Sequence, residues 1–224
     1  MITAVSVIQT FIFQENNFPA PANCDDPNAI TFDDDDFFFA FTDTSGIDHA
    51  DGELVIAEVK GNKMLEFVDD GTNFADGTVQ KIKIDAARLL SPENLAKVHS
   101  VELDVYADAT AKELVTENGR SVKAPGWIGG GAGANTSGDK WYEFGDWEGG
   151  EYNFRMSGAV HLELKFLLAE KGQCWGDMDE AALVIMRWGA QNEGNFYIDN
   201  IVFYDENKNS LPIEKSAKPE KSDD

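Results

Sequence analysis

Residues 101–106 read Val-Glu-Leu-Asp-Val-Tyr, and this alternation of apolar and polar side chains decides the fold class. Side chains along a β-strand point alternately to its two faces, so Val101, Leu103 and Val105 are expected to share one buried face. Residues 161–166, His-Leu-Glu-Leu-Lys-Phe, repeat the pattern. Both segments therefore predict strands that cover a core with one face and expose the other face to solvent.

Seven further segments predict strands, and turns that contain Gly or Asp separate them. They are Thr31–Phe41, Leu54–Val59, Met64–Val68, Gln80–Asp85, Tyr152–Met156, Leu183–Trp188 and Phe196–Tyr204. Within Gln80–Asp85, Ile82 and Ile84 are expected to point inward. One short helix is expected at Ser91–Lys97, because Ser91 can cap its N-terminus and Pro92 suits its first position. Many strands and one short helix predict an all-β fold, a β-sandwich jelly roll of two antiparallel sheets.

The sandwich is expected to span residues 29–207, between two segments without a sustained strand pattern. Residues 1–28 predict an N-terminal strand and a tether. The apolar start is interpreted as a strand because it lacks the basic region that a signal peptide has. Residues 208–224 are charged and predict a disordered linker tail. Two cysteines, Cys24 and Cys174, define no disulfide framework, so a bond between them and two free thiols both stay open.

The chain of 224 residues carries 41 acidic and 18 basic side chains, which gives a formal net charge of −23. This balance argues against nucleic acid and anionic membrane surfaces, because both need clustered Lys and Arg. A hydrophobic content of 42% still predicts a folded protein. The sequence contains no run of 18 apolar residues, so no membrane-spanning helix is expected. The charge remains compatible with a neutral ligand or a cation.

All five tryptophans lie between residues 127 and 188, and four of them stand in or beside Gly- and Asp-rich segments. These four are Trp127, Trp141, Trp147 and Trp175. Rings exposed among polar neighbours can stack on sugars, at on the order of 1 kcal/mol per ring, so at least two of the four are expected to contact ligand. Trp188 shares a strand face with Val184 and Met186, and for it both core packing and ligand contact stay open. Gly129–Gly133 predicts a flexible loop beside the binding face.

The closing segment Asn195–Tyr204, NFYIDNIVFY, resembles the last strand of jelly-roll carbohydrate-binding modules found in plant-cell-wall-degrading enzymes and cellulosomal proteins. Three other segments resemble strands of the same modules: Ala29–Asp33, Val59–Phe67 and Val98–Ala107. The resemblance covers residues 29–207. It implies a non-catalytic module that binds a neutral β-linked polysaccharide of the plant cell wall, such as β-glucan, xyloglucan, mannan or cellulose. It also implies a parent multidomain enzyme or scaffold that the module holds on the wall.

The same resemblance implies a structural calcium ion, held by Asp33 and Asp199 together with backbone carbonyls of residues 60–62. Asp33 stands where those modules usually carry Glu, and hard oxygen ligands of this kind suit calcium. Outward positions on the predicted strands and their ends supply further candidate ligand contacts, namely Tyr106, Arg187 and Gln191. A cell-wall ligand implies a secreted, extracellular protein, attached to a cell surface or to a cellulosome.

Two other functions stay open at this point. A β-sandwich glycoside hydrolase or lyase needs two carboxylates about 5–10 Å apart, and Glu102 with Glu163 could supply them. Residues 102–106 resemble the E-x-D-x-E signature of laminarinase-type hydrolases, but Tyr106 replaces the third acid, so a protein that is not an enzyme is favoured. A structural or adhesion module would instead bury its tryptophans and bind no sugar.

Overall fold

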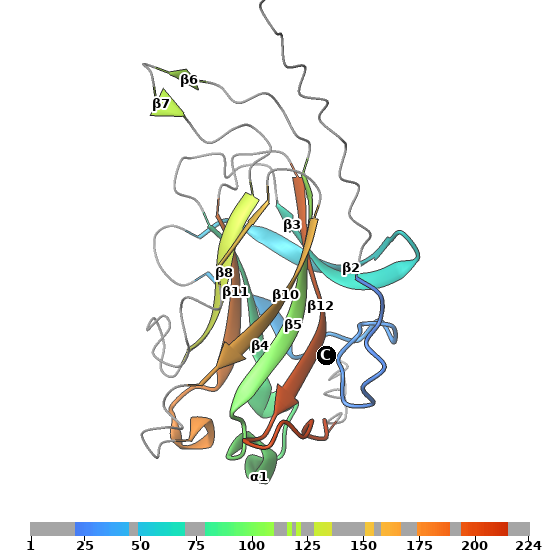
Figure 1. The fold of residues 1–224 in the computed structure, drawn as a ribbon, viewed down its shortest axis with the longest axis vertical. Helices are drawn as coiled ribbons and strands as arrows, with labels where there is room; N and C mark the ends of the chain where they lie inside the picture. Colours follow the sequence, from blue (N-terminus) through green and yellow to red (C-terminus); the bar gives the residue numbers. More distant parts are fainter. Residues whose placement is uncertain are drawn as a thin grey trace, which may run out of the picture.

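The computed structural model describes residues 21–44, 49–69, 79–109, 116–117, 120–121, 128–135, 151–154, 158–166, 174–188 and 194–214. Within these residues, two five-stranded sheets pack face to face as two layers (Figure 1). Every strand pair in both sheets is antiparallel. The predicted β-sandwich of two antiparallel sheets is therefore confirmed.

The first sheet, called the β5 sheet, has the strand order β10 (Gly158–Lys165), β5 (Ser100–Ala109), β12 (Gly194–Tyr204), β3 (Asn62–Asp69), β2 (Gly52–Val59). The second, called the β11 sheet, has the order β1 (Ala40–Thr42), β4 (Val79–Asp85), β11 (Ala182–Trp188), β8 (Ile128–Asn135), β9 (Glu151–Phe154). The other described elements are the strand pair β6 (Thr116–Glu117) and β7 (Arg120–Ser121) and the short helices η1 (Ala86–Arg88), α1 (Pro92–Leu95) and η3 (Trp175–Asp177).

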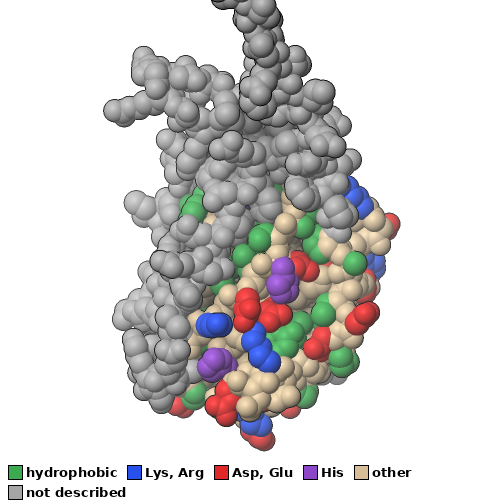
Figure 2. All heavy atoms as spheres, in the orientation of Figure 1, with side chains coloured by type: hydrophobic (Ala, Val, Ile, Leu, Met, Phe, Trp, Pro, Cys, Tyr) green, Lys and Arg blue, Asp and Glu red, His purple; other side chains and the backbone are tan. Residues whose placement is uncertain are grey.

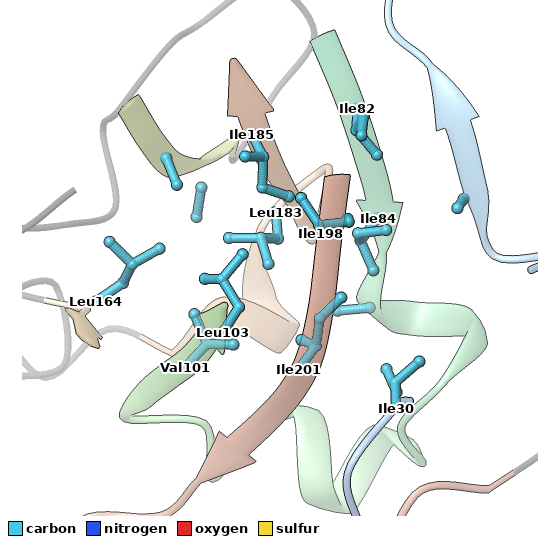
Figure 3. Close-up of a cluster of buried hydrophobic side chains, with 14 of the residues drawn as sticks. Ile30, Ile82, Ile84, Val101, Leu103, Leu164, Leu183, Ile185, Ile198 and Ile201 are labelled. Carbon is cyan, nitrogen blue, oxygen red and sulfur yellow. The ribbon is translucent and has the colours of Figure 1, made fainter. Parts of the chain in front are cut away.

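The core lies between the two sheets and is filled by every second residue of the central strands. Figure 3 shows the branched side chains of Ile82 and Ile84 from β4 and Leu183 and Ile185 from β11 close to Ile198 from β12. All five are fully buried. Because burying one such side chain contributes about 1.5–3 kcal/mol, these alternating positions fix which face of each strand points inward. The predicted inward orientation of Ile82 and Ile84 is confirmed.

The predicted helix is confirmed as α1, although it is shorter than the predicted segment. The hydroxyl of Ser91 accepts a hydrogen bond from the Asn94 N–H at 3.2 Å, and Pro92 occupies the first turn. Leu95 anchors the helix in the core cluster. Among the described residues, no helix has the length and apolar character needed to cross a membrane.

The predicted strand Thr31–Phe41 is wrong over most of its length, since only its last two residues belong to β1. Phe32 and Asp35 both have a φ of 58°, which lies outside the extended region that a strand requires. The Asp35 N–H donates to the Phe32 carbonyl at 3.1 Å and closes a tight turn. Short acidic side chains favour such turns, and here they override the apolar content of the segment.

The prediction of a flexible loop at Gly129–Gly133 is also wrong, because these residues form most of β8, an interior strand of the β11 sheet. Ala132 and Ala134 of β8 point into the core. Glycine alternates with alanine along β8. Because glycine has no side chain, this alternation carries little hydrophobic contrast and does not indicate a strand in the sequence.

Residues 208–214, which belong to the predicted linker tail, pack on the sandwich. Leu211 is buried, and its N–H donates to the Phe203 carbonyl at 2.8 Å. Asn28 connects the other end of the described chain to this segment through a 2.8 Å hydrogen bond to the Ser210 hydroxyl. The predicted N-terminal strand and the tail beyond residue 214 lie outside the described residues. Both cysteines are free thiols.

Gly52 at the start of β2 is a position where a side chain does not fit, because a Cβ there would overlap the Phe67 ring and the Val68 carbonyl oxygen. Gly52→Ala is expected to lower the free energy of unfolding by about 1–3 kcal/mol, measured by urea unfolding. Gly176→Ala is the matched control, since its Cβ would meet the nearest atom at an ordinary 3.5 Å. Equal losses of stability in the two variants would contradict this packing.

Candidate functional site

The outer face of the β11 sheet, on the side away from the core, carries a strip of apolar side chains. Val184, Met186 and Trp188 alternate with the inward residues of β11, and Val79 of β4 pairs directly with Trp188. The four side chains form one cluster, in which the aliphatic members are buried and Trp188 remains partly exposed. Trp188 is therefore the one member of this cluster with a partly exposed ring that could stack on a ligand, since the other three side chains are buried.

The strand next to this strip presents backbone in place of side chains. Gly129, Gly131 and Gly133 of β8 pair with Trp188, Met186 and Val184 of β11, so the three glycines lie on the same outer face. Glycine inside a strand weakens it, and it often marks a place where a ligand or another backbone approaches closely. The three glycines are themselves buried, so they lie next to Trp188 but are not open to solvent.

The opposite side of the same face carries Phe41 of β1, which pairs with Lys83 of β4. Phe41 is 38% exposed and is the single large hydrophobic side chain that is exposed among the described residues. The Arg88 guanidinium lies over its ring, 4.6 Å from the centroid, and Lys83 forms an ion pair with Glu180. Strand spacing and rise place Phe41 and Trp188 roughly 15 Å apart across this face. Sequence reasoning missed Phe41, because it stood at the end of a wrongly predicted strand.

Four of the predicted ligand residues, Trp127, Trp141, Trp147 and Gln191, lie outside the described residues. The prediction for Trp175 is wrong, since its side chain is fully buried. Its ring packs 4.7 Å from the ring of Phe166 and 6.3 Å from that of Phe203, measured between centroids. The polar neighbours of Trp175 belong to the short helix η3, which turns the indole into the core. A Gly- and Asp-rich context therefore did not indicate exposure at this position.

Two further predicted ligand residues are also buried. Arg187 shares the inward face of β11 with Leu183 and Ile185, and its guanidinium donates to the Gln80 side chain at 2.9 Å within the sandwich. Tyr106 does point away from the core, but it does so on the β5 sheet, where Tyr197 covers it with a centroid distance of 5.7 Å. Tyr106 and Trp188 thus lie on opposite faces of the molecule, and one binding site cannot contain both.

The residues predicted to hold calcium occupy different environments. Asp199 on β12 is fully buried; its Oδ2 accepts from the Asn62 amide at 2.7 Å, and its Oδ1 has no hydrogen-bond partner among the described residues. Asp33 is exposed and accepts from the Asn23 amide and the Thr31 hydroxyl. The Pro21 carbonyl lies 2.8 Å from the same Asn62 amide nitrogen, so a backbone oxygen is also close.

Burial, together with the charges of Asp104 and Asp33, raises the pKa of Asp199 to about 7 against the opposing hydrogen bonds from Asn62 and the Asn200 N–H. A buried carboxylate with one unpaired oxygen, near backbone carbonyls, fits a hard cation. The described residues contain no group of three or more His, Cys, Asp or Glu side chains arranged around a metal. A cation at Asp199 would therefore need backbone oxygens as further ligands. The predicted site, with the carboxylates of Asp33 and Asp199 only, also included backbone carbonyls.

A second group of polar side chains lies on the outer face of the β5 sheet. His161 of β10 pairs in register with Asp104 of β5, and its ring nitrogens lie 2.8 Å from Asp104 and 3.3 Å from Glu102. Asn200 donates to the other Asp104 oxygen at 2.6 Å. Figure 2 shows acidic side chains gathered around histidine and basic side chains on the described surface above β5, β10 and β12. The strand alternation identifies His161 and Asp104, but Asn200 comes from a β-bulge that no sequence period reveals.

Glu102 and Glu163, the candidate glycosidase pair, are bridged by a lysine. The two residues are direct neighbours on β5 and β10, and Lys208 donates to both, at 2.9 Å and 2.5 Å. This lysine lowers the pKa of Glu163, whereas an acid catalyst requires a raised pKa. The lysine also fills the space where a glycosidic bond would have to lie between the two carboxylates.

Comparisons with known proteins give a likeness of overall structure only. No protein-family model and no curated protein matches the chain. Among solved structures, the chain is similar to the mannan-recognising carbohydrate-binding module TmCBM27 at 16% identity, over 74% of this chain and 87% of that one, with a TM-score of 0.39. It is similar to the CBM22-1 xylan-binding domain of Paenibacillus barcinonensis Xyn10C at 9% identity, over 84% and 94%, with a TM-score of 0.42.

An enzyme is also among the similar structures. The MgGH51 α-L-arabinofuranosidase aligns at 8% identity over 80% of this chain and 25% of that chain, with a TM-score of 0.42. At these TM-scores and identities, the likenesses carry no argument about what this chain binds or which residues bind it.

The contacts of His161 predict a pH dependence of stability. Burial lowers the pKa of His161, but the hydrogen bonds and charges of Asp104 and Glu102 outweigh burial and hold it above the ordinary value of 6.5. A raised pKa in the folded state means that this stabilisation is complete below the unfolded pKa and is lost as pH rises through the folded pKa. The advantage of the wild type over His161→Gln in urea unfolding is therefore expected to be larger at about pH 5.5 than at about pH 8.5.

Subtracting the stability of His161→Gln from that of the wild type removes the contribution of groups that titrate in both proteins. The same unfolding experiment with Asp104→Asn and with the double variant is the control, because His161→Gln should change stability less once Asp104 has lost its charge. A wild-type advantage that grows with pH would contradict the assignment of His161 as a cation held by two carboxylates.

Proposed function

We propose that this protein is a non-catalytic carbohydrate-binding module and that the outer face of its β11 sheet binds a neutral β-linked glycan of the plant cell wall. The observation that carries the proposal is the partly exposed indole of Trp188 beside the glycine strip of β8. A sugar ring has an apolar face that stacks on an indole. The closing-strand resemblance at Asn195–Tyr204 supports the same class of function.

The two outer faces differ in their chemistry, and this difference favours the β11 sheet. The outer face of the β5 sheet carries Glu102, Asp104, His161 and Glu163 in hydrogen-bonded pairs, and binding there would break these pairs. The outer face of the β11 sheet carries the Lys83–Glu180 ion pair, but it also offers two partly exposed rings, Trp188 and Phe41. Desolvating apolar rings stabilises a complex with a sugar, whereas desolvating ion pairs costs free energy.

The proposal extends to the setting of the protein. A module that binds cell wall holds an attached enzyme or scaffold on its substrate, so a parent multidomain protein is part of this proposal. A plant cell wall ligand places the chain outside the cell, in secreted form, on a cell surface or within a cellulosome. Calcium is proposed at Asp199, where it would neutralise the buried carboxylate and attach the segment at Pro21 to the sheet.

The first test is affinity electrophoresis through gels that contain mixed-linkage β-glucan, xyloglucan, mannan, xylan or a soluble cellulose derivative. At least one polysaccharide is expected to retard the wild type. Trp188→Ala is expected to weaken binding about five- to tenfold, because the stacking of one ring is lost. Trp175→Phe is the control, since it lowers stability while leaving affinity unchanged.

Retardation by none of these polysaccharides would contradict the proposed function. Retardation that persists in Trp188→Ala and also in alanine variants of Trp127, Trp141 and Trp147 would leave the function intact and overturn the site. Release of reducing ends from any of the polysaccharides, lost in Glu163→Gln, would establish the glycoside hydrolase alternative. A folded protein that binds no glycan would favour the structural or adhesion alternative.

Calcium is expected to raise the stability of the protein, and EDTA is expected to reverse the effect. At a concentration one hundred times Kd, the gain in free energy of unfolding is about 2.7 kcal/mol. Asp199→Asn should abolish this calcium-dependent gain, whatever its effect on stability without calcium. Asp179→Asn removes the same charge at an exposed position and should preserve the gain. Thermal unfolding with and without calcium measures both variants, and a gain that survives Asp199→Asn would contradict the assignment.

A further inference from the structure

A cavity of about 200 Å³ lies outside both outer faces, between the Ala29–Phe39 segment, η1 and the end of the described chain. The apolar part of its lining consists mainly of Ile30, Phe32, Phe38, Phe39, Leu89 and Ile213. The volume is below the roughly 300 Å³ at which pockets for drug-sized ligands begin, so the cavity suits one compact group.

Three phenylalanine rings form a corner in the wall of this cavity. The Phe38 and Phe39 rings are nearly perpendicular, with an interplanar angle of 80° and centroids 5.5 Å apart. The Phe32 and Phe39 rings are stacked, with an interplanar angle of 30° and centroids 6.1 Å apart. A ring attracts a cation through its negative face and not through its positive edge, so a corner of rings can hold a cation where it presents a face. Such aromatic corners bind ammonium groups whose substituents are apolar.

The rim of the cavity is acidic. Asp33, Asp34 and Asp36 line it, and the first two are exposed to solvent. Asp35, the fourth member of the acidic run, does not line the cavity, and its carboxylate forms an ion pair with Lys63 at 2.8 Å. The Asp33 carboxylate accepts from the neutral donors Asn23 and Thr31, and the Asp36 carboxylate accepts from the Phe38 N–H, while Lys63 Nζ donates to the Asp33 backbone carbonyl at 3.2 Å. The carboxylates at the rim therefore add negative potential at the mouth of an aromatic corner.

The nearest basic side chain in sequence, Arg88, has its guanidinium elsewhere. It donates to Asp85 at 3.1 Å and to the Phe38 carbonyl at 3.0 Å, and it covers the ring of Phe41. Arg88 is not part of the cavity lining. The net charge of −23 on the whole chain further favours the approach of a cation over that of an anion.

We propose that this cavity binds an alkylammonium cation, with its apolar substituents against Phe32, Phe38 and Phe39 and its charge facing Asp34 and Asp36. The group can belong to a free small molecule, such as a quaternary amine, or to a methylated lysine side chain of another protein. This site lies apart from the proposed glycan face and does not depend on it.

The test uses choline as the probe and follows the ¹H–¹⁵N spectrum of the full chain during titration. Saturable shifts are expected at residues 30–39, 89 and 213, with a Kd in the millimolar range. The neutral isostere 3,3-dimethylbutan-1-ol has the same shape without the charge and is expected to bind about tenfold more weakly. Added NaCl should weaken choline binding more than isostere binding, because salt screens the exposed carboxylates.

Matched variants distinguish the contribution of the carboxylates to choline binding from that of the aromatic rings. Asp34→Asn combined with Asp36→Asn is expected to weaken choline binding several-fold, whereas Asp35→Asn removes a charge from the same run and should leave binding unchanged. Phe38→Leu keeps an apolar side chain and removes the π-face, so it should abolish the preference for choline over the isostere. The spectrum of each variant without ligand reports whether the fold is retained.

A peptide that contains trimethyllysine distinguishes the two sources of the cation. Binding of the peptide at least as tight as that of choline assigns the cavity to a protein side chain, and binding of choline alone assigns it to a small molecule. Equal binding of choline and its isostere, shifts outside the cavity, or the absence of saturable shifts with both choline and the peptide would overturn the proposal.

Discussion

The structure depends on one constraint, which is that two sheets must bury one face each against the other. Inward positions on β4, β11 and β12 are occupied by Ile82, Ile185 and Ile198, and a shift of one residue in any strand would exchange its two faces. This parity decides the position of every polar and aromatic residue on the strands. Arg187 is buried because it lies two residues from Ile185, and Trp188 reaches the outer face because it is the next residue.

Because of the same constraint, the two outer faces of the sandwich carry different kinds of side chain. The β5 sheet places its outward carboxylates beside His161 and Lys208, so that its outer face is closed by hydrogen bonds between charged groups. The β11 sheet places glycines, apolar side chains and the lysines Lys81 and Lys83 outward, with the indole of Trp188 partly exposed. In a chain with a net charge of −23, this face therefore offers the rings of Trp188 and Phe41 to a neutral ligand beside the Lys83–Glu180 ion pair.

The strands with alternating branched and polar side chains could be predicted from the sequence, because a buried Val or Leu at every second position leaves few other structures. β8 could not be predicted, since its period consists of glycine against alanine and carries little hydrophobic contrast. The burial of Trp175 could not be predicted either, because η3 turns the ring inward through tertiary contacts with Phe166 and Phe203. The hydrogen bond between Asp199 and Asn62 joins positions that are 137 residues apart, and no local sequence pattern predicts such a contact.

A crystal structure of the chain with a bound oligosaccharide would show directly which outer face holds the glycan. The ligand should be one whose parent polysaccharide retards the protein in gels. Sugar rings are expected on the outer face of the β11 sheet, with one ring stacked on Trp188. Sugar density over His161 and Glu163 on the β5 sheet, or at a site without contact to Trp188 or β8, would contradict this expectation.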